Sequence, residues 1–235
     1  MYPIQQTNDN AQNHSNKVEW QGHYGGDITH GLSAWTSTHR DLPQEKLDRL
    51  PAMLAKLALE KHETPFEKSC LHYLVDTDIA SHIHILKHRI AVSVNAESAR
   101  YKELKEDKFY IPDDFYKVPV SDEHELGTDY KNWADVLIDM SNATNTLYHS
   151  CVKDVEKVFG RKRAKESARF FKMYNSQIQA DVMFNWRSFA HFLLLRRDFK
   201  KAQKEIAEVA DRMLDLVKQI PGNPFKHTLT AFGLD

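Results

Sequence analysis

The sequence predicts a chain of mixed α and β structure, in which long amphipathic helices accompany two strands. Residues 17–24 alternate weakly between apolar and polar side chains and end at Gly25-Gly26, which favours a strand followed by a turn. Residues 66–75 hold an apolar run without Gly or Pro, which favours a buried strand. Elsewhere, apolar residues recur every three or four positions, the period of a helix that buries one face.

Composition limits the classes of protein that the chain can belong to. Its 235 residues are enough for one full hydrophobic core, so we expect a single domain over residues 17–235 after a polar, flexible tail at residues 1–16. A formal net charge of -1 argues against a general binder of nucleic acid or of membrane surfaces. No apolar run approaches the ~20 residues of a membrane helix. Cys70 and Cys151 lack a metal-like or redox-like spacing, which favours a reducing cytoplasm.

The first half of the chain is expected to form three helices around its strands. Asp27 can cap a short helix. An amphipathic helix should begin at Pro43, kink or restart at Pro51 and end before Pro65. The triplet at residues 76–78 can cap a third helix. Its expected apolar face consists of Ile79, Ile83, Leu86 and Ile90. His84, Lys87 and His88 should share another face of that helix.

The second half is expected to be mainly helical after an extended stretch and a surface connection. The stretch covers residues 108–112 and the connection residues 113–125. The predicted helices cover Trp133 to Gly160, about residues 161–174, Phe184 to Arg197, and residues 202–220 before Pro221-Gly222.

Any phosphate that this chain binds must be held by side chains, because the usual glycine-rich nucleotide loops are missing. Guanidinium groups suit this task, since their forked donors match phosphate oxygens. The cationic candidates are Lys87, Arg89, Arg100, Arg163, Arg169, Arg187 and Arg196. Arg187 and Arg196 interrupt an apolar helix on different faces, which indicates different neighbours on its two sides, such as different subunits.

Three polar positions leave alternatives open. His84 and His88 stand four residues apart and could share a metal ion, but no third ligand has a telling spacing, so we predict hydrogen-bonded histidines and no metal site. Ser98 could be a nucleophile, but no adjacent residue supplies a base, so a hydrogen-bonding or turn role is favoured. Asn185 could serve the site, or it could simply be a capping or interior polar group of the helix that it begins.

Four segments, in one order along the chain, resemble the flavin-dependent thymidylate synthases. His88-Arg89, eight residues and Ser98-Ala99-Arg100-Tyr101 resemble that family's signature of Arg-His-Arg, seven or eight residues and Ser. The other three segments are His62-Glu63-Thr64-Pro65-Phe66-Glu67, Glu166-Ser167-Ala168-Arg169, and Asn185 to Arg196 followed by Ala202-Gln203-x-Glu205-Ile206. The likeness runs from about Val18 to the end of the chain.

The resemblance implies an α+β fold with a central mixed or antiparallel sheet flanked by long helices. It also implies a homotetramer with FAD at subunit junctions. Such an enzyme converts dUMP to dTMP, with methylenetetrahydrofolate as the one-carbon donor and NADPH as the source of electrons for the flavin.

When the family's site residues are carried over to the matching positions of this sequence, the resemblance implies two sets of site residues. The dUMP set is His84, Ser98, Ala99, Arg100, Arg169 and Arg196. The FAD set is Ser37, Lys68, Lys87, His88, Arg89, Glu97, Asn185, Arg187 and His191. Ser98 and Arg196 are the expected catalytic residues; Ser98 would position and polarise dUMP rather than attack it.

The sequence departs from the family pattern at several of these positions. Lys87 replaces the first Arg of the signature, which keeps the charge but loses the fork. Lys68 stands where many members have His, and His191 where some have Asn. Ala96 replaces a common acidic residue, and the neighbouring Glu97 could substitute for it.

Two other functions remain open at this point. A flavin-dependent enzyme with these residues could transfer a hydroxymethyl group to a pyrimidine nucleotide instead of a methyl group. A non-catalytic helical assembly protein that binds nucleotides through basic helix ends is the alternative from a different class.

Overall fold

The computed structural model describes residues 15–123 and 130–235. The chain forms two compact units. Unit 1 contains residues 76–82 and 96–179, with Ser15 and Asn16 at the described N-terminal end; unit 2 contains residues 17–75, 83–95 and 180–235. Most of the predicted tail lies outside the described residues, as do residues 124 and 125 of the predicted connection. The single domain over residues 17–235 stays a prediction.

A four-stranded antiparallel sheet confirms the predicted α+β class. Its order is β1 (Lys17–Tyr24), β2 (Cys70–Asp78), β4 (Gln177–Phe184) and β3 (Val92–Ala96). Most of the sheet belongs to unit 2. β1 has the predicted bounds, but β2 begins at Cys70, because the preceding residues form a 3-10 helix, η1 (Thr64–Glu67). The sequence did not predict β3 or β4.

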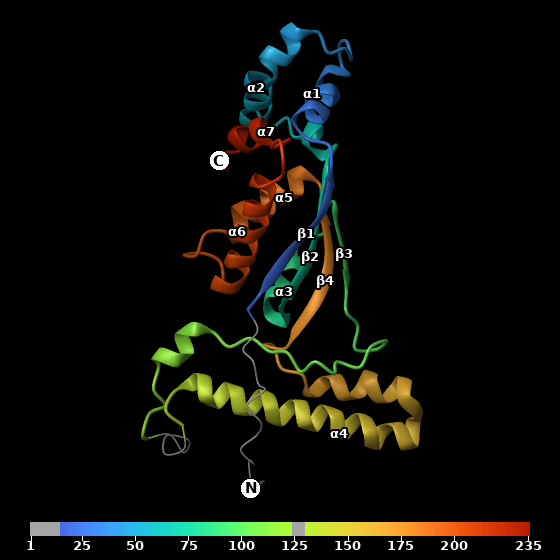
Figure 1. Cartoon of the computed structure of the whole chain (residues 1–235), viewed down its shortest axis with the longest axis vertical. Helices are drawn as coiled ribbons and strands as arrows, with labels where there is room; N and C mark the ends of the chain where they lie inside the picture. The colour runs from blue at the N-terminus through green and yellow to red at the C-terminus, as the bar shows by residue number, and fades with distance from the viewer. Residues whose placement is uncertain (1–14, 124–129) are drawn as a thin grey trace. The chain divides into compact units, whose positions relative to one another are not determined.

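The helices of unit 2 cover this sheet or pack on one another. They are α1 (Asp27–Trp35), α2 (Gln44–Leu59), α5 (Trp186–Arg196), α6 (Lys204–Lys218) and α7 (Lys226–Ala231). In Figure 1, α6 lies beside β1 and α5, and α7 lies beside α2. The boundary between the units passes through α3 (Ile79–Leu86).

Two predicted helix features in unit 2 are wrong. Gly26, not Asp27, is the N-cap of α1, and the Asp27 carboxylate instead accepts hydrogen bonds from α7. The α2 helix does not restart at Pro51, because one helix runs from Gln44 to Leu59; the alternative of a kink at Pro51 stays a prediction. A proline inside a helix removes one hydrogen bond and its ring clashes with the carbonyl four residues before it, which favours a kink rather than a new start.

The third predicted helix is correct in its start but too long at its end. Asp78 Oδ1 accepts the Ser81 N–H at 2.8 Å, which confirms a cap from the acidic triplet. The α3 helix ends at Leu86, and Ile90 is 84% exposed rather than part of a buried face. Lys87 and His88 therefore follow the helix instead of lying on its surface. Ala91 has a positive φ of 51°, so the chain turns sharply before β3.

Unit 1 is built around α4 (Trp133–Ala168), which is interrupted at Gly160. There φ is 79° and ψ is 161°, a conformation that favours glycine, and the helix folds back into two arms (Figure 1). The break confirms the predicted helix end at Gly160. The second arm ends at Ala168 and is followed by η3 (Arg169–Phe171), so the basic helix is shorter than predicted. A second 3-10 helix, η2 (Asp113–Lys117), lies in the predicted surface connection.

No helix in the described ranges is long and apolar enough to cross a membrane.

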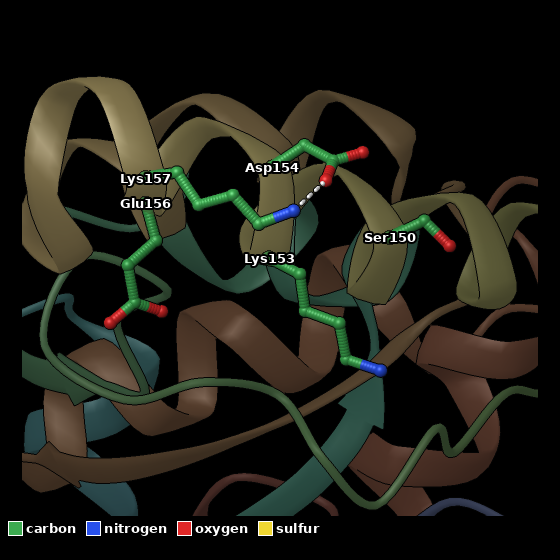
Figure 2. Close-up of a pocket in the computed structure, with 5 residues that line it drawn as sticks. All are labelled: Ser150, Lys153, Asp154, Glu156 and Lys157. Carbon is green, nitrogen blue, oxygen red and sulfur yellow. Dashed lines mark hydrogen bonds and ion pairs between the residues drawn. The ribbon is translucent and has the colours of Figure 1, made fainter.

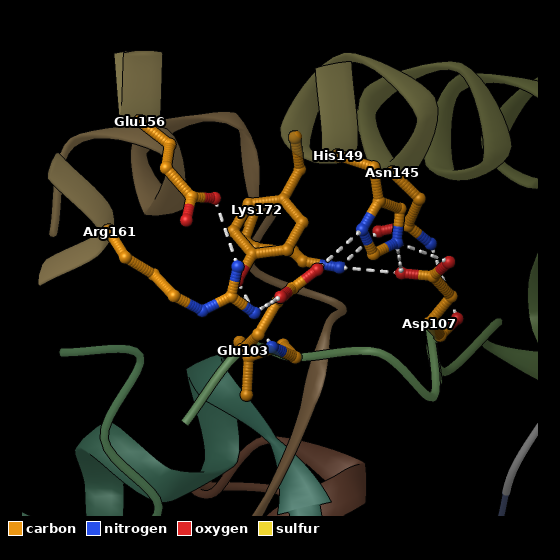
Figure 3. A network of polar contacts seen from close by, with 9 residues as sticks. Glu103, Asp107, Asn145, His149, Glu156, Arg161 and Lys172 are labelled. Atoms are coloured by element: carbon orange, nitrogen blue, oxygen red, sulfur yellow. Dashed lines mark hydrogen bonds and ion pairs between the residues drawn. The ribbon is translucent and has the colours of Figure 1, made fainter. Parts of the chain in front are cut away.

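A buried lysine organises the polar contacts of unit 1 (Figure 3). The Lys172 side chain is 5% exposed, and its Nζ donates to Asp107 at 2.9 Å and to Asn145 at 2.6 Å. The ammonium group also lies 4.4 Å from the centre of the Tyr148 ring. His149 contacts the other oxygen of Asp107 at 2.9 Å. These contacts join the segment before β4 to α4 and to the loop at residue 107.

Candidate active site

A large cavity in unit 2 is the strongest candidate site. Its volume is about 850 Å³. Four segments line it: η1 with Glu63 before it, residues 87–91 after α3, the start and outer face of α5, and the residues that follow α7. The lining holds five Lys or Arg side chains and two carboxylates. An excess of cationic groups suits a negatively charged ligand.

The loop at residues 87–91 is held in place by the start of α5. Asn185 Oδ1 accepts the Ser188 N–H at 2.9 Å, so Asn185 caps the helix, and its role in the site stays a prediction. The Asn185 N–H donates to Ala91 O at 3.2 Å, and Ser188 Oγ donates to Ile90 O at 2.6 Å. These bonds fix the loop that carries Lys87, His88 and Arg89 against the cavity.

Arg187 is held on the cavity wall by two carboxylates. Its Nε donates to Glu63 at 2.8 Å and its Nη1 to Glu67 at 2.6 Å. These hydrogen bonds, that to Glu67 first, raise the pKa of Arg187, which stays cationic. These two hydrogen bonds use Nε and Nη1 of the guanidinium group.

His88 and Arg196 are partners in the same cavity. Arg196 Nε donates to His88 Nε2 at 3.1 Å, so the acceptor nitrogen of His88 must be unprotonated. Burial, together with the charge of Arg196, lowers the pKa of His88 to about 4. His88 is therefore neutral at pH 7. Its ring packs edge-on against the Phe192 ring, with the two ring centroids 5.1 Å apart.

The structure brings together six of the nine residues assigned to FAD. Lys87, His88, Arg89, Asn185, Arg187 and His191 all line the cavity of unit 2. Ser37 and Lys68 also belong to unit 2 but do not line the cavity; Ser37 Oγ donates to Ala34 O at 2.9 Å. Glu97 belongs to unit 1, where it pairs with Lys102 at 2.7 Å.

The residues assigned to dUMP fall in both units. Ser98, Ala99, Arg100 and Arg169 belong to unit 1, and His84 and Arg196 to unit 2. Arg100 Nε contacts Glu166 at 2.7 Å, and Ser98 Oγ accepts the Arg100 N–H at 3.3 Å. His84 contacts the Gln203 side chain at 3.2 Å.

Sequence reasoning missed several residues of this cavity. Glu63 and Glu67 lie in a motif that was noted for its resemblance, but nothing local indicated that both would contact Arg187. Phe232 and Leu234 also line the cavity, and no motif pointed to them.

Other polar clusters do not form a comparable site. A shallow depression of about 470 Å³ lies along α4 and is lined by Ser150, Lys153, Asp154, Glu156 and Lys157 (Figure 2). Its Asp154–Lys157 pair is a surface contact at 2.9 Å, with both side chains more than 70% exposed. Within residues 15–123 and 130–235, no group of three or more His, Cys, Asp or Glu side chains could hold a metal ion.

A family model matches most of the chain. Residues 15–221 match the model described as thymidylate synthase complementing protein. A flavin-dependent thymidylate synthase from Thermosipho melanesiensis is 34% identical over 163 residues, which cover 68% of this chain and 67% of that one. One from Tropheryma whipplei is 29% identical over 177 residues, 71% of each chain. The chain belongs to the thymidylate synthase complementing protein family, and its class is that of a methyltransferase enzyme.

The fold is also found among solved structures. A UMP/dUMP methylase, PolB from Streptomyces cacaoi, bound with 5-Br dUMP, is 22% identical. The match covers 93% of this chain and 95% of that one with a TM-score of 0.71. The same protein bound with 5-Br UMP gives a TM-score of 0.69 at 23% identity, over 96% of this chain and 98% of that one. At this identity the likeness supports the fold alone.

Proposed function

We propose that this enzyme is a flavin-dependent thymidylate synthase that converts dUMP to dTMP by reductive methylation. One observation carries the proposal: a single cavity collects six residues that the family pattern assigns to the flavin, and Arg196 from the nucleotide set. The family match and the names of the curated relatives support the same reaction.

The residues present fit FAD. Lys87, Arg89 and Arg187 line the cavity and supply cationic donors for a pyrophosphate. Apolar side chains, among them Ile90 and Leu194, are exposed at the cavity and can cover a planar ring. The bound flavin would supply reducing equivalents from NADPH for the one-carbon unit of methylenetetrahydrofolate.

His88 and Arg196 have separate tasks in this proposal. A neutral His88 adds no charge beside the flavin and accepts the Arg196 Nε–H, which fixes the direction of the guanidinium. Arg196 then offers its other nitrogens to dUMP. A charged donor near pyrimidine oxygens stabilises negative charge that develops on the ring.

The remaining dUMP residues bind and orient the nucleotide. Arg100 and Arg169 suit the phosphate, with Glu166 as the partner of Arg100 before the ligand arrives. His84 and Ala99 complete the set. Ser98 positions and polarises dUMP; its Oγ accepts a backbone N–H from Arg100, and no base contacts it among the described residues, which fits a role without nucleophilic attack.

We also infer that the active enzyme is a homotetramer. Several apolar side chains of α4 and η3 are exposed in the single chain, from 47% to 84%: Met140, Leu147, Val158, Phe159 and Phe170. A partner subunit would cover such a surface. Light scattering on the purified protein tests the inference, and a mass equal to one chain contradicts it.

The other two functions are less well supported. The curated relatives are named thymidylate synthases, and the solved neighbours are described as methylases, so hydroxymethyl transfer is not favoured. A non-catalytic assembly protein does not agree with membership of an enzyme family. A reducing cytoplasm as the location stays a prediction.

Product analysis tests the proposed reaction. The purified protein is incubated with FAD, NADPH, methylenetetrahydrofolate and dUMP, and the nucleotide product is identified by mass spectrometry. We expect dTMP. A hydroxymethylated nucleotide would replace the proposal by its alternative, and recovery of unchanged dUMP from a protein that binds no flavin would reject it.

A further inference from the structure

The segment that follows α7 forms one wall of the cavity in unit 2. Phe232, Gly233 and Leu234 line it together with the basic loop and α5. The matched family model ends at residue 221, before this wall begins. No site residue carried over by resemblance comes from it.

The conformation of this segment is fixed by the end of α7. Gly233 has a φ of 64°, its N–H donates to Thr230 O at 3.0 Å, and the Leu234 N–H donates to Leu229 O at 3.0 Å. This pair of hydrogen bonds is the Schellman motif, which turns the chain back over the last helical turn. Leu234 is thereby placed at the cavity instead of continuing away from it.

A series of buried hydrogen bonds anchors the α7 helix, and the donor and acceptor of each can be assigned. Asp27 accepts the Thr228 N–H at 2.8 Å and the Thr228 Oγ1–H at 2.6 Å. Because Thr228 Oγ1 donates to Asp27, it must accept from His30 Nδ1 at 3.0 Å. His30 Nε2 is then the acceptor for Ser69 Oγ at 2.8 Å. The wall is therefore tied to α1 and to the start of β2.

Aromatic packing and a close backbone approach hold the same wall. The Phe232 ring meets Phe66 edge-on, with the centroids 4.9 Å apart. A Cβ atom at Gly26 would lie 2.4 Å from Pro224 O, so only glycine lets α1 approach the loop before α7 this closely. An anchored wall presents its apolar groups to a ligand without a large ordering cost.

The wall differs in chemistry from the rest of the cavity. Lys87, Arg89 and Arg187 lie on the other segments, whereas the wall offers the Phe232 ring and the Leu234 side chain. A ligand with both phosphates and a flat apolar ring matches this division. We propose that Phe232 and Leu234 contact a planar ring of the bound flavin dinucleotide, which makes this segment a previously unassigned part of the cofactor site.

The proposal rests on the proposed function, and flavin titrations test the two separately. FAD and FMN are titrated into the wild-type protein and into the Leu234→Ala variant, and absorbance and fluorescence are followed. We expect a roughly fivefold weaker dissociation constant for the variant, because apolar contact area is lost. Weaker binding of both flavins places the isoalloxazine ring at the wall, and weaker binding of FAD alone places the adenine there.

Two further variants serve as controls. Leu59→Ala makes the same change at a leucine that is 83% exposed on α2 and does not line the cavity, and it should bind like the wild type. Leu234→Met keeps the apolar volume and should retain wild-type affinity. Equal affinities and spectra for the wild type and Leu234→Ala overturn the inference. A wild-type protein that binds neither flavin instead contradicts the proposed function, and the inference with it.

Discussion

Arg196 is the residue at which the two predicted sets of ligand contacts meet. It was assigned to dUMP from the family pattern, and in the structure its Nε donates to His88, a residue assigned to FAD. Both line one cavity. Arg187 lines the same cavity, so the two faces of α5 that carry Arg187 and Arg196 share one surrounding within this chain, and the predicted different neighbours on the two sides of the helix are not seen there.

The first prediction concerns the Arg196→Ala variant. We expect dUMP binding to weaken by about 2 kcal/mol, roughly 30-fold, because a charge-assisted contact is lost. Isothermal titration with dUMP and with FAD measures the effect for each ligand. The control is Arg212→Ala, at an exposed arginine of α6 outside the cavity. Unchanged dUMP affinity together with weaker FAD binding would move Arg196 to the cofactor set.

The second prediction concerns pH and His30. Burial lowers the pKa of His30 from 6.5 to about 4, so between these values the unfolded chain takes up a proton that the folded chain does not. The contribution of His30 to the stability of the fold is therefore fully present above pH 6.5 and is lost as the pH falls toward 4. We expect the contribution of His30 to the free energy of unfolding to drop by about 3 kcal/mol across this range.

Urea unfolding at a series of pH values measures this loss. His30→Gln should remove the part of the pH dependence that comes from His30 and leave the part from His88, whose pKa is also lowered to about 4. His39→Gln, at an exposed histidine, should leave the dependence unchanged. The same dependence in His30→Gln as in the wild type would contradict the assignment to His30.

At the scale of elements, Asp107 links the buried Lys172 to the α4 hairpin through His149. Burial lowers the pKa of Lys172, while its hydrogen bond to Asp107 acts in the opposite direction. The third prediction is that Asp107→Asn destabilises the protein by about 2 kcal/mol, since a buried ammonium group loses its counter-charge. Thermal or urea unfolding measures the change.

Asp154→Asn is the matched control, because it removes a carboxylate from an exposed ion pair of the same helix. It should leave the stability close to that of the wild type, because solvent screens an exposed ion pair. Equal effects of the two substitutions would show that the Lys172 network does not stabilise unit 1.

The predicted elements succeeded where one strong local pattern decides the structure. The strand β1, the amphipathic α2 and α6, and the break of α4 at Gly160 all follow from periodicity or from glycine. β4 was missed because Gln177, Gln179 and Asp181 give this segment a polar sequence. It forms a strand because it pairs with β2 on one side and with β3 on the other. α7 was missed because six residues carry too little periodicity, and its stability comes from Asp27.

At the scale of the whole molecule, the site residues could be predicted only through several motifs in one order. Composition excluded broad classes of partner, and the arginines indicated an anionic ligand. The six flavin residues of the cavity come from the loop after α3 and from α5, which lie about 100 positions apart in the sequence. No local pattern can bring such segments together, and the contacts of Arg187 with Glu63 and Glu67 are equally remote.

The central claim is that this chain joins flavin chemistry to dUMP. The most direct test is a single-turnover experiment without oxygen, in which reduced FAD bound to the protein is mixed with methylenetetrahydrofolate, with and without dUMP. The account predicts that the absorbance of oxidised flavin returns only when dUMP is present, together with formation of dTMP. Flavin that stays reduced in the presence of both substrates would contradict it.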